Sequence, residues 1–502
     1  MLPINGIKLR PDEDEDKLKD KIEKKLRHPI RSFEIRKKSL DARKEPIYVY
    51  SVIVDIENEK RFLSRDVTLY TKENLRPEYK ERNCTCIVAG YGPSGIFAAL
   101  RLMEAGFKVH VFEKGKRIRE REKDVERFFE TGVLDPSSNV QFGEGGAGTF
   151  SDAKLTTRIK DRYIDYILDS FIQHGAARSI RYENYAHIGT DEIRRIIESL
   201  TDDMIKNGVI FHFEEEMEEI ILNERREVTQ IRTKKGAYPC DHLLLGIGHS
   251  AYDTIRMLKK KGVFIESKDI ALGFRVEHPQ DFIDARQTRS IVETANEYFL
   301  RYKGDKGVYS FCMCPGGIVI PAMSDEGTIV TNGMSYAARD SGVANSAILI
   351  QIGKDEFENG YAFLHGLEKD AYRYSDSYRA LSQNIADFME GKTEPLRFPS
   401  TYPLGTVLYD FNSFFSERDC RILKEAFLDF DRKIPGFIDK GIMVGPETRS
   451  SCPIRIRRNE HYESINTGNL FPMGEGAGYG GGIMSCALDG IRIANELICR
   501  HG

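Results

Sequence analysis

The sequence lacks an excess of either charge, and it lacks a long apolar run. Its 502 residues include 74 basic and 78 acidic side chains, which give a formal net charge of -4. Because these charges are mixed along the chain, they provide no basic field for nucleic acid or anionic lipid. No apolar run is long enough to cross a bilayer, and the acidic start "MLPINGIKLRPDEDEDK" lacks the apolar segment of a signal peptide. We therefore expect a cytoplasmic protein that acts on a small molecule, without nucleic-acid or membrane partners.

The sequence also lacks the cysteine patterns of a disulfide framework or a zinc site. Its nine cysteines are odd in number and scattered, which is typical of reduced thiols. Two Cys-x-Cys pairs occur, Cys84 with Cys86 and Cys312 with Cys314, but there are no paired Cys-x-x-Cys sets and no His-rich tracts. We therefore predict no metal site.

A chain of this length exceeds what one compact core usually holds, so two or three domains are expected. The charged first eighty residues predict a strand, a helix and two further strands. From Cys84 a strand, a glycine turn, a helix and a strand follow, and "MEEIILNERREVTQIRTKKGAYPC" predicts a β-meander. The next region mixes glycine-rich strands with predicted helices near Ala344 and Asp419. The predicted domains are residues 1–80, 81–267, 268–440 and 441–502.

These patterns predict an α/β fold with three parts. The central part is a Rossmann-like, doubly wound parallel sheet with a β-meander, formed by residues 81–267 and completed by residues 441–502. Residues 268–440 form an inserted α+β substrate domain, and residues 1–80 form a small N-terminal α+β domain.

The stretch "CIVAGYGPSGIFAALRLMEAGFKVHVFEKG" carries a dinucleotide-binding fingerprint. Gly90, Gly92 and Gly95 form a GxGxxG between an apolar strand and a helix, and Glu113 ends the next strand. The helix that begins near Ser94 directs free N–H groups at phosphate. A carboxylate at the strand end accepts from ribose hydroxyls and repels a 2′-phosphate, which argues against NADP. This loop alone leaves NAD and FAD open.

Two further glycine loops favour FAD over NAD. They read "NVQFGEGGAGTFSD" and "GEGAGYGGGIMSCALDG". A simple NAD dehydrogenase has no evident use for them, whereas the longer FAD needs backbone along its length. The helix that starts near Ile483 has a packed apolar face, and its positive end would stabilise a reduced flavin.

On the motifs "GYGPSGIFAAL", "FGEGGAGTFSDAKL", "LLLGIGHSAYDT", "GPETRSSCPIRI" and "GEGAGYGGGIMSCALDG", the chain resembles the glutathione-reductase-type FAD superfamily. It is most similar to bacterial FAD-dependent dehydrogenases of unassigned substrate. The resemblance covers essentially the whole chain. It implies that Gly90, Gly92, Pro93, Ser94 and Gly95 lie at the pyrophosphate, Glu113 and Lys114 at the ribose, Met217 at the adenine, and Gly145, Gly146, Ala147, Thr149, Ser151, Asp152, Gly248, Gly474, Glu475, Gly482 and Ile483 along the rest of FAD.

The segment in which a flavin disulfide reductase would carry its cysteine pair has no cysteine. Cys312 and Cys314 are a weaker candidate, because buried cysteines mostly act as small apolar residues and no basic residue adjoins the pair. Arginines near a flavin can hold a carboxylate or phosphate, which makes Arg275, Arg449 and Arg455 candidate substrate residues. The sequence assigns no catalytic acid or base.

We therefore expect an enzyme, a FAD-dependent oxidoreductase that binds FAD noncovalently. It would transfer a hydride between flavin N5 and a small organic substrate. Because a second complete GxGxxG is not evident, NAD(P)H is expected only as a transient electron donor. Two alternatives stay open. One is a flavin monooxygenase, and the other is a FAD-binding regulatory or RNA-associated protein that uses the basic segment "KKLRHPIRSFEIRKKSL".

Overall fold

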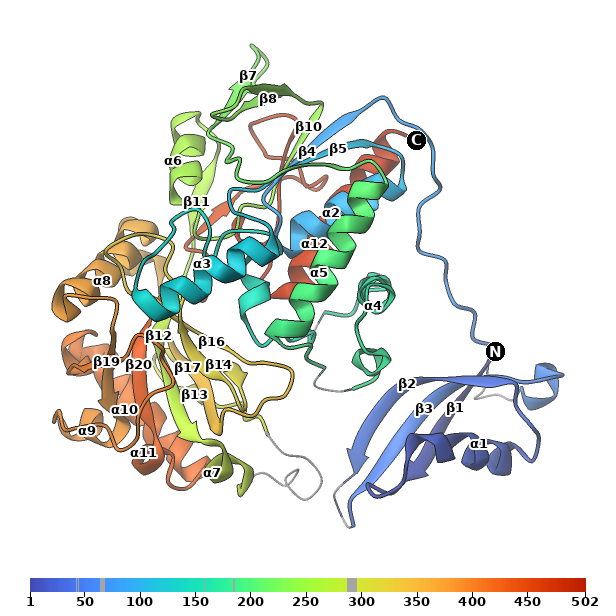
Figure 1. Ribbon diagram of the computed structural model, residues 1–502, viewed down its shortest axis with the longest axis horizontal. Coiled ribbons are helices and arrows are strands. Elements are labelled where there is room, and N and C mark those ends of the chain that lie inside the picture. The colour runs from blue at the N-terminus through green and yellow to red at the C-terminus, as the bar shows by residue number, and fades with distance from the viewer. Residues whose placement is uncertain (42, 44, 64–67, 158, 184–185, 287–295) are drawn as a thin grey trace.

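The computed structural model describes residues 1–502 apart from 42, 44, 64–67, 158, 184–185 and 287–295. Three parts are seen: a small N-terminal sheet, a five-stranded parallel sheet, and a seven-stranded mixed sheet with helices (Figure 1). Among the helices of the described residues, none combines the length and the apolar character needed to cross a membrane.

The N-terminal part is a three-stranded antiparallel sheet with one helix packed on it. Its strand order is β1-β3-β2. Leu18 and Ile22 are one turn apart on the helix and are fully buried against the sheet, which explains why so charged a helix is held there. The elements are β1 (Leu2–Leu9), α1 (Leu18–Leu26), β2 (Ser32–Asp41) and β3 (Ile47–Asp55).

The parallel sheet has the order β22-β10-β4-β5-β6, in which β4 and β5 are the two strands predicted on either side of the first glycine turn and its helix. The three helices α2, α5 and α12 cover one face of it, and the meander with α6 covers the other (Figure 1). The strands and the meander are β4 (Thr85–Ala89), β5 (Lys108–Phe112), β6 (Ile210–His212), β7 (Glu219–Leu222), β8 (Val228–Arg232), β9 (Ala237–Pro239), β10 (His242–Leu245) and β22 (Leu470–Pro472). The helices are α2 (Pro93–Glu104), α3 (Ile118–Thr131), α4 (Tyr163–Gln173), α5 (Thr190–Lys206), α6 (Tyr252–Lys260) and α12 (Ile483–Arg500).

The third part, which we call the second unit, is built on the seven-stranded sheet. Its strand order is β13-β14-β17-β12-β20-β18-β19. Phenylalanines from the sheet and from α10, such as Phe274, Phe427 and Phe430, are fully buried in its core. Its strands are β12 (Ile270–Pro279), β13 (Arg301–Lys303), β14 (Gly307–Cys314), β17 (Val343–Ile352), β18 (Ala380–Asn384), β19 (Thr406–Leu408) and β20 (Ile442–Glu447), with a hairpin of β15 (Ile318–Pro321) and β16 (Thr331–Met334). Its helices are α7 (Gln280–Asp284), α8 (Gly360–Ser375), α9 (Ile385–Glu390), α10 (Glu417–Lys433) and α11 (Phe437–Lys440).

The two connections between the parallel sheet and the second unit lie side by side. The chain leaves through β11 (Ile265–Ser267) and returns through β21 (Ile454–Ile456), and these two strands pair antiparallel. This pairing holds the second unit over one end of the parallel sheet.

Two predictions about the second unit were wrong. The segment near Ala344 is strand β17, not a helix; its apolar run is buried and pairs with β12 on one side and β14 on the other. The second unit also extends past residue 440, because β20 pairs with β12 and β18 up to Glu447. The predicted helix near Asp419 is present as α10.

Candidate functional site

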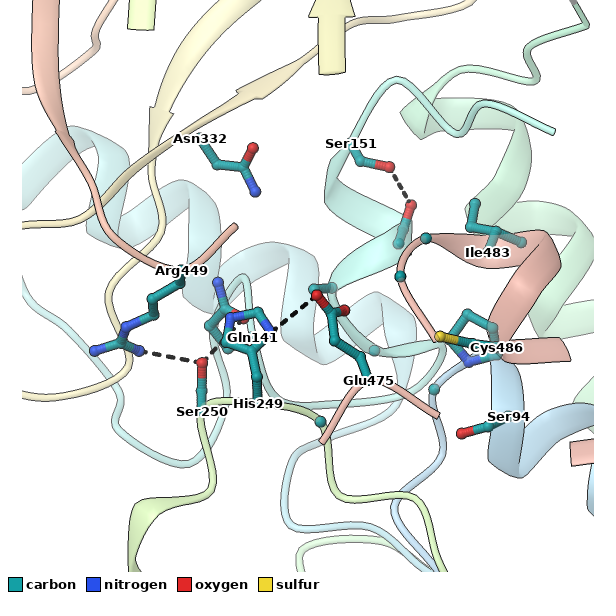
Figure 2. A pocket seen from close by; sticks show the side chains of 18 of the residues that line it. Ser94, Gln141, Ser151, His249, Ser250, Asn332, Arg449, Glu475, Ile483 and Cys486 are labelled. Carbon is teal, nitrogen blue, oxygen red and sulfur yellow. Dashed lines mark hydrogen bonds and ion pairs between the residues drawn. The ribbon is translucent and has the colours of Figure 1, made fainter. Parts of the chain in front are cut away.

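A cavity lies at the carboxyl ends of β4 and β10, where the loops of the parallel sheet face the second unit (Figure 2). Ligands of open α/β sheets bind at this end of the strands. The wall comprises the three glycine loops and the β10 loop on one side, and Phe311, Cys312, Asn332, Glu447 and Arg449 on the other. A second, smaller pocket shares Gly90 and Glu113 with this cavity and is also lined by Lys114 and Met217.

The first glycine loop makes the tight turn that the fingerprint requires. Gly90 has a φ of +93°, and a Cβ on it would lie 2.3 Å from the carbonyl oxygen of Gly246. A Cβ on Gly95 would lie 2.1 Å from the oxygen of Gly90, so these two glycines serve packing within the loop. Gly92 differs, because its Cβ position has only one atom within 4 Å, the Cα of Gly146 at 3.9 Å. Its open side faces the cavity.

Glu113 fixes the first two loops relative to each other. Its carboxylate is almost fully buried and accepts hydrogen bonds of 2.9 Å from the backbone N–H groups of Tyr91, Gly115 and Gly143. A carboxylate can accept about four hydrogen bonds, so one lone pair is left for a ribose hydroxyl. At the far end of this pocket, Lys114 lies over the ring of Phe142, with Nζ 4.6 Å from its centroid.

One buried arginine fixes the second loop through hydrogen bonds to its backbone and to Thr149. Arg121 on α3 is fully buried, and its guanidinium donates to the backbone oxygens of Asn139, Val140 and Glu144 and to Thr149 Oγ1, at 2.7–3.0 Å. Gly146, Ala147, Ser151 and Asp152 line the cavity, whereas Gly145 and Thr149 face a small apolar space on the other side of the loop.

The C-terminal loop brings the start of α12 to the cavity wall. A Cβ on Gly490 would lie 2.1 Å from the oxygen of Ser94, so α12 and α2 pack with their backbones in contact. Gly474 donates its N–H to Asp489 and packs behind the wall against Ser94. Gly482 and Ile483 line the cavity and present the positive end of the helix to it.

The cavity fits a dinucleotide cofactor. The backbone at Gly248, Gly481 and Gly482 has open space where a Cβ would stand, as at Gly92. A ligand can therefore approach the backbone closely on several sides. Of the residues predicted to hold FAD, the wall of the cavity and of the smaller pocket includes Gly90, Gly92, Pro93, Ser94, Glu113, Lys114, Gly146, Ala147, Ser151, Asp152, Met217, Gly248, Glu475, Gly482 and Ile483; Gly95, Gly145, Thr149 and Gly474 pack behind it.

The three arginines predicted to bind substrate have different places. Arg455 does not line the cavity; it lies over the ring of Tyr479, with its guanidinium 5.2 Å from the centroid. Arg275 is fully buried behind the wall, where its Nε lies 2.6 Å from Glu447 Oε2 and its Nη2 donates to Asn332 Oδ1 at 2.6 Å. Arg275 therefore orients two side chains that line the cavity.

Arg449 lies in the cavity wall, but its donors are already engaged. It donates to Glu368 through Nε at 3.0 Å and Nη2 at 2.8 Å, and to Asp325 at 3.0 Å. Its Nη1 donates to Ser324 at 2.6 Å and to Ser250 at 3.2 Å. These bonds use all five N–H groups of a guanidinium, so Arg449 has none left to grip an anion.

His249 lies beside Glu475 in the wall (Figure 2). Its Nδ1 is 3.5 Å from Glu475 Oε1, and its Nε2 has no hydrogen-bond partner among the described residues. A carboxylate on one ring nitrogen and a free second nitrogen is an arrangement suited to proton transfer.

Cys312 also lines the cavity, at an irregular point of β14. It has a φ of +42°, and the pairing of β14 with β17 shifts register between Phe311 and Cys314. A hydrogen bond with Cys314, together with the nearby charges of Arg275 and Lys154, lowers the pKa of Cys312 although burial opposes this, and the pKa of Cys314 is raised. The sequence showed no basic neighbour because both basic residues come from distant segments.

Sequence reasoning missed several residues of the wall. Gln141 lies in the quoted second loop; it donates to the oxygen of Ala322 at 3.0 Å and accepts from Ser250 at 3.3 Å. Lys154 lies in the same segment, two residues after Asp152, and was not singled out. Asn332 gave no signal of its own, because only the folded chain brings it to the loops.

Comparison with known proteins identifies the family. The chain is 39% identical over 527 aligned residues to an uncharacterized protein of Clostridium beijerinckii, and the match covers 99% of this chain and 98% of that one. The chain belongs to the family of this clostridial protein. Residues 269–450 match the family described as FAD-dependent protein, C-terminal domain-like, and residues 1–56 match a domain of unknown function, DUF8436. The match of residues 269–450 to a FAD-dependent family, together with the dinucleotide loops, identifies FAD as the cofactor. The prediction of FAD is confirmed.

Solved structures resemble the chain only distantly. A geranylgeranyl bacteriochlorophyll reductase-like protein of Thermoplasma acidophilum is 13% identical with a TM-score of 0.37, and the match covers 83% of this chain and 79% of that one. The tetracycline destructase Tet(51) is 12% identical with a TM-score of 0.34, over 84% and 83% of the two chains. These values are too low to transfer a reaction.

Proposed function

We propose that the protein is an oxidoreductase of the glutathione-reductase-type superfamily that binds FAD noncovalently and transfers a hydride between flavin N5 and a small organic substrate. The observation that carries this proposal is that one cavity is lined both by the dinucleotide loop and by the second unit. The second unit contributes the polar side chains of Asn332, Glu447 and Arg449, so a cofactor on the loops and a substrate beside these side chains would meet. FAD, when bound, supplies the two-electron chemistry.

We propose an uncharged substrate with a carbonyl or hydroxyl group. The cations of the cavity wall are already paired: Arg449 with Glu368, and Lys154 with Glu297 at 3.0 Å. Asn332 accepts through Oδ1 from Arg275, which leaves its Nδ2 group to donate to such a substrate. His249 would hold or deliver the proton at Nε2, with Glu475 orienting the ring through Nδ1.

The first experiment is an anaerobic absorbance titration of the purified protein with NADH and then NADPH. Prompt bleaching of the oxidised flavin bands supports a nicotinamide donor that binds transiently. Flavin that neither nucleotide reduces points to the substrate as the reductant, and a panel of alcohols and carbonyl compounds would then be tried beside matched carboxylates. A protein that stays colourless after FAD is added would contradict the proposal. Oxygen uptake coupled to a hydroxylated product would make the protein a monooxygenase instead.

Cytoplasmic location and the absence of nucleic-acid and membrane partners stay predictions from the sequence.

A further inference from the structure

A second group of chemically active side chains lies at the opposite end of the parallel sheet from the cofactor cavity. Cys84 directly precedes β4, His242 begins β10, and His501 follows α12. The glycine loop follows the other end of β4. The five residues of that strand separate the two places by roughly 15 Å.

Three potential ligand atoms converge there. His242 Nε2 lies 2.8 Å from His501 Nε2, and Cys84 Sγ lies 3.8 Å from His501 Nε2. All three atoms lie within 4.8 Å of one another. Cys84 and His242 are buried, and His501 is exposed. One thiol and two imidazoles from three distant segments are therefore held at a single point.

These separations fit a tetrahedral metal ion. Zinc bonds of about 2.3 Å to sulfur and about 2.0–2.1 Å to nitrogen, at tetrahedral angles, place a sulfur and a nitrogen about 3.6 Å apart and two nitrogens about 3.3 Å apart. The Cys84–His501 separation already matches this closely. The two histidine nitrogens need to move apart by about 0.5 Å, and Cys84 Sγ, which lies within 4.8 Å of the ligand nitrogen of His242, needs to lie about 3.6 Å from it.

The surroundings orient the ligands and leave one side open. The ring of His501 meets Phe107 edge-on at 5.6 Å, and the ring of His242 meets Phe471 in the same way at 5.6 Å. A cleft open to solvent adjoins the three side chains, and its wall includes three carboxylates and two cations, namely Glu81, Glu227, Asp241, Lys80 and Arg82. Water from this cleft can reach a fourth coordination position, and the charge of the wall does not oppose a cation.

We propose that Cys84, His242 and His501 form a zinc-binding site whose fourth ligand is water. Thiolate and imidazole together are the ligands that zinc prefers. Zinc would join the linker that precedes β4, the start of β10 and the end of α12. The sequence gave no sign of it, because the ligands stand at positions 84, 242 and 501 and form no short metal-binding motif. The proposal does not depend on the reaction at the cofactor cavity.

The test is a titration of the full-length protein, first freed of metal by a chelator, with Co²⁺. One Co²⁺ per chain is expected, with the intense visible bands of tetrahedral Co²⁺ at wavelengths beyond the flavin absorption. One equivalent of Zn²⁺ should remove these bands. The variants Cys84→Ser and His501→Ala should bind Zn²⁺ more than about tenfold more weakly.

Cys499→Ser is the matched control, because Cys499 is an exposed cysteine two residues from His501 and outside the cluster. It should keep both the Co²⁺ spectrum and the Zn²⁺ affinity. Zn²⁺ should raise the unfolding temperature of the wild type and of this control but not of His501→Ala. Unchanged Zn²⁺ affinity in His501→Ala, or only the weak bands of octahedral Co²⁺, would overturn the proposal. FAD content is measured in every sample. Tetrahedral Co²⁺ in a protein that binds no FAD would leave this proposal standing and refute the proposed function alone.

Discussion

Glu368 and Arg449 are joined by two parallel hydrogen bonds, from Nε to Oε1 at 3.0 Å and from Nη2 to Oε2 at 2.8 Å. Glu368 lies on α8, and Arg449 follows β20 and reaches Ser250 after β10. Both side chains are buried. The pair therefore ties the second unit to the parallel sheet beside the cofactor cavity.

Replacing Glu368 with Gln should destabilise the protein strongly. The amide cannot accept both hydrogen bonds, and the buried guanidinium loses its main counter-charge. We expect the free energy of unfolding to fall by about 3–5 kcal/mol, measured by urea denaturation. Asp370→Asn is the matched control, because Asp370 lies on the same helix and forms an exposed ion pair with Arg373. Its effect should stay below about 1 kcal/mol. Equal losses of unfolding free energy in the two variants would show that the buried pair stabilises the protein no more than the exposed pair does.

The same pair predicts a dependence of stability on pH. Burial by itself would raise the pKa of Glu368, but the charge of Arg449, the nearby His365 and the hydrogen bond from Thr448 outweigh it and lower the pKa to about 2. The unfolded carboxyl has a pKa of about 4.3, so between these values the unfolded state binds more protons than the folded state. The stabilisation is therefore present above about pH 4.3 and is lost as the pH falls toward 2. The stability difference between wild type and Glu368→Gln should shrink over this range, and a difference that stays constant would contradict the assignment.

The features that could be predicted from the sequence are those formed by residues close together along the chain. The GxGxxG loop, Glu113 and the helix α12 follow from patterns within a few tens of residues, and the structure brings them together as expected. The role of Arg449 could not be predicted, because its partner Glu368 lies on another element about eighty positions away. For the same reason Arg275 was predicted to meet the substrate, although it lies behind the wall and orients Glu447. The error at Ala344 has a similar origin, since only the neighbours β12 and β14 make its apolar run a buried strand.

Filling the open side of Gly92 should abolish FAD binding without unfolding the chain. Gly92 has a φ of −83°, which any residue adopts, and the side chain of Gly92→Val would project into the cavity. We expect FAD affinity to fall by roughly a hundredfold or more, since a valine would occupy the pyrophosphate path. The measurement is a titration of the apoprotein by flavin fluorescence, with circular dichroism to check the fold. Gly366→Ala on α8, where the Cβ also enters open space but outside the cavity, is the control and should bind FAD normally. Normal FAD affinity in Gly92→Val would place the cofactor elsewhere.

Cys312 should react as an acidic thiol that FAD protects. A free cysteine has a pKa of about 8.5, and the hydrogen bond with Cys314 and the charges of Arg275 and Lys154 lower that of Cys312. In a Cys499→Ser background, which removes the exposed thiol, the rate of alkylation of the apoprotein by iodoacetamide should reach half its maximum well below pH 8.5. Added FAD should slow the reaction, because Cys312 lines the same cavity. Cys312→Ser should lose the fast phase. A fast phase that survives in this variant would belong to another thiol.

His249→Gln should separate proton transfer from cofactor binding. Glutamine keeps a polar side chain beside Glu475 but cannot accept and release a proton near neutral pH. With whichever donor reduces the flavin, we expect the rate of reduction to fall by about 10²–10⁴-fold, while FAD content stays unchanged. Glu475→Gln should lower the rate less, because it removes only the group that orients the ring. His461→Gln is the control, since that histidine is exposed and does not line the cavity. If His249→Gln reduces the flavin at the wild-type rate, the proton comes from another group, and Cys312 is the next residue of the wall to replace.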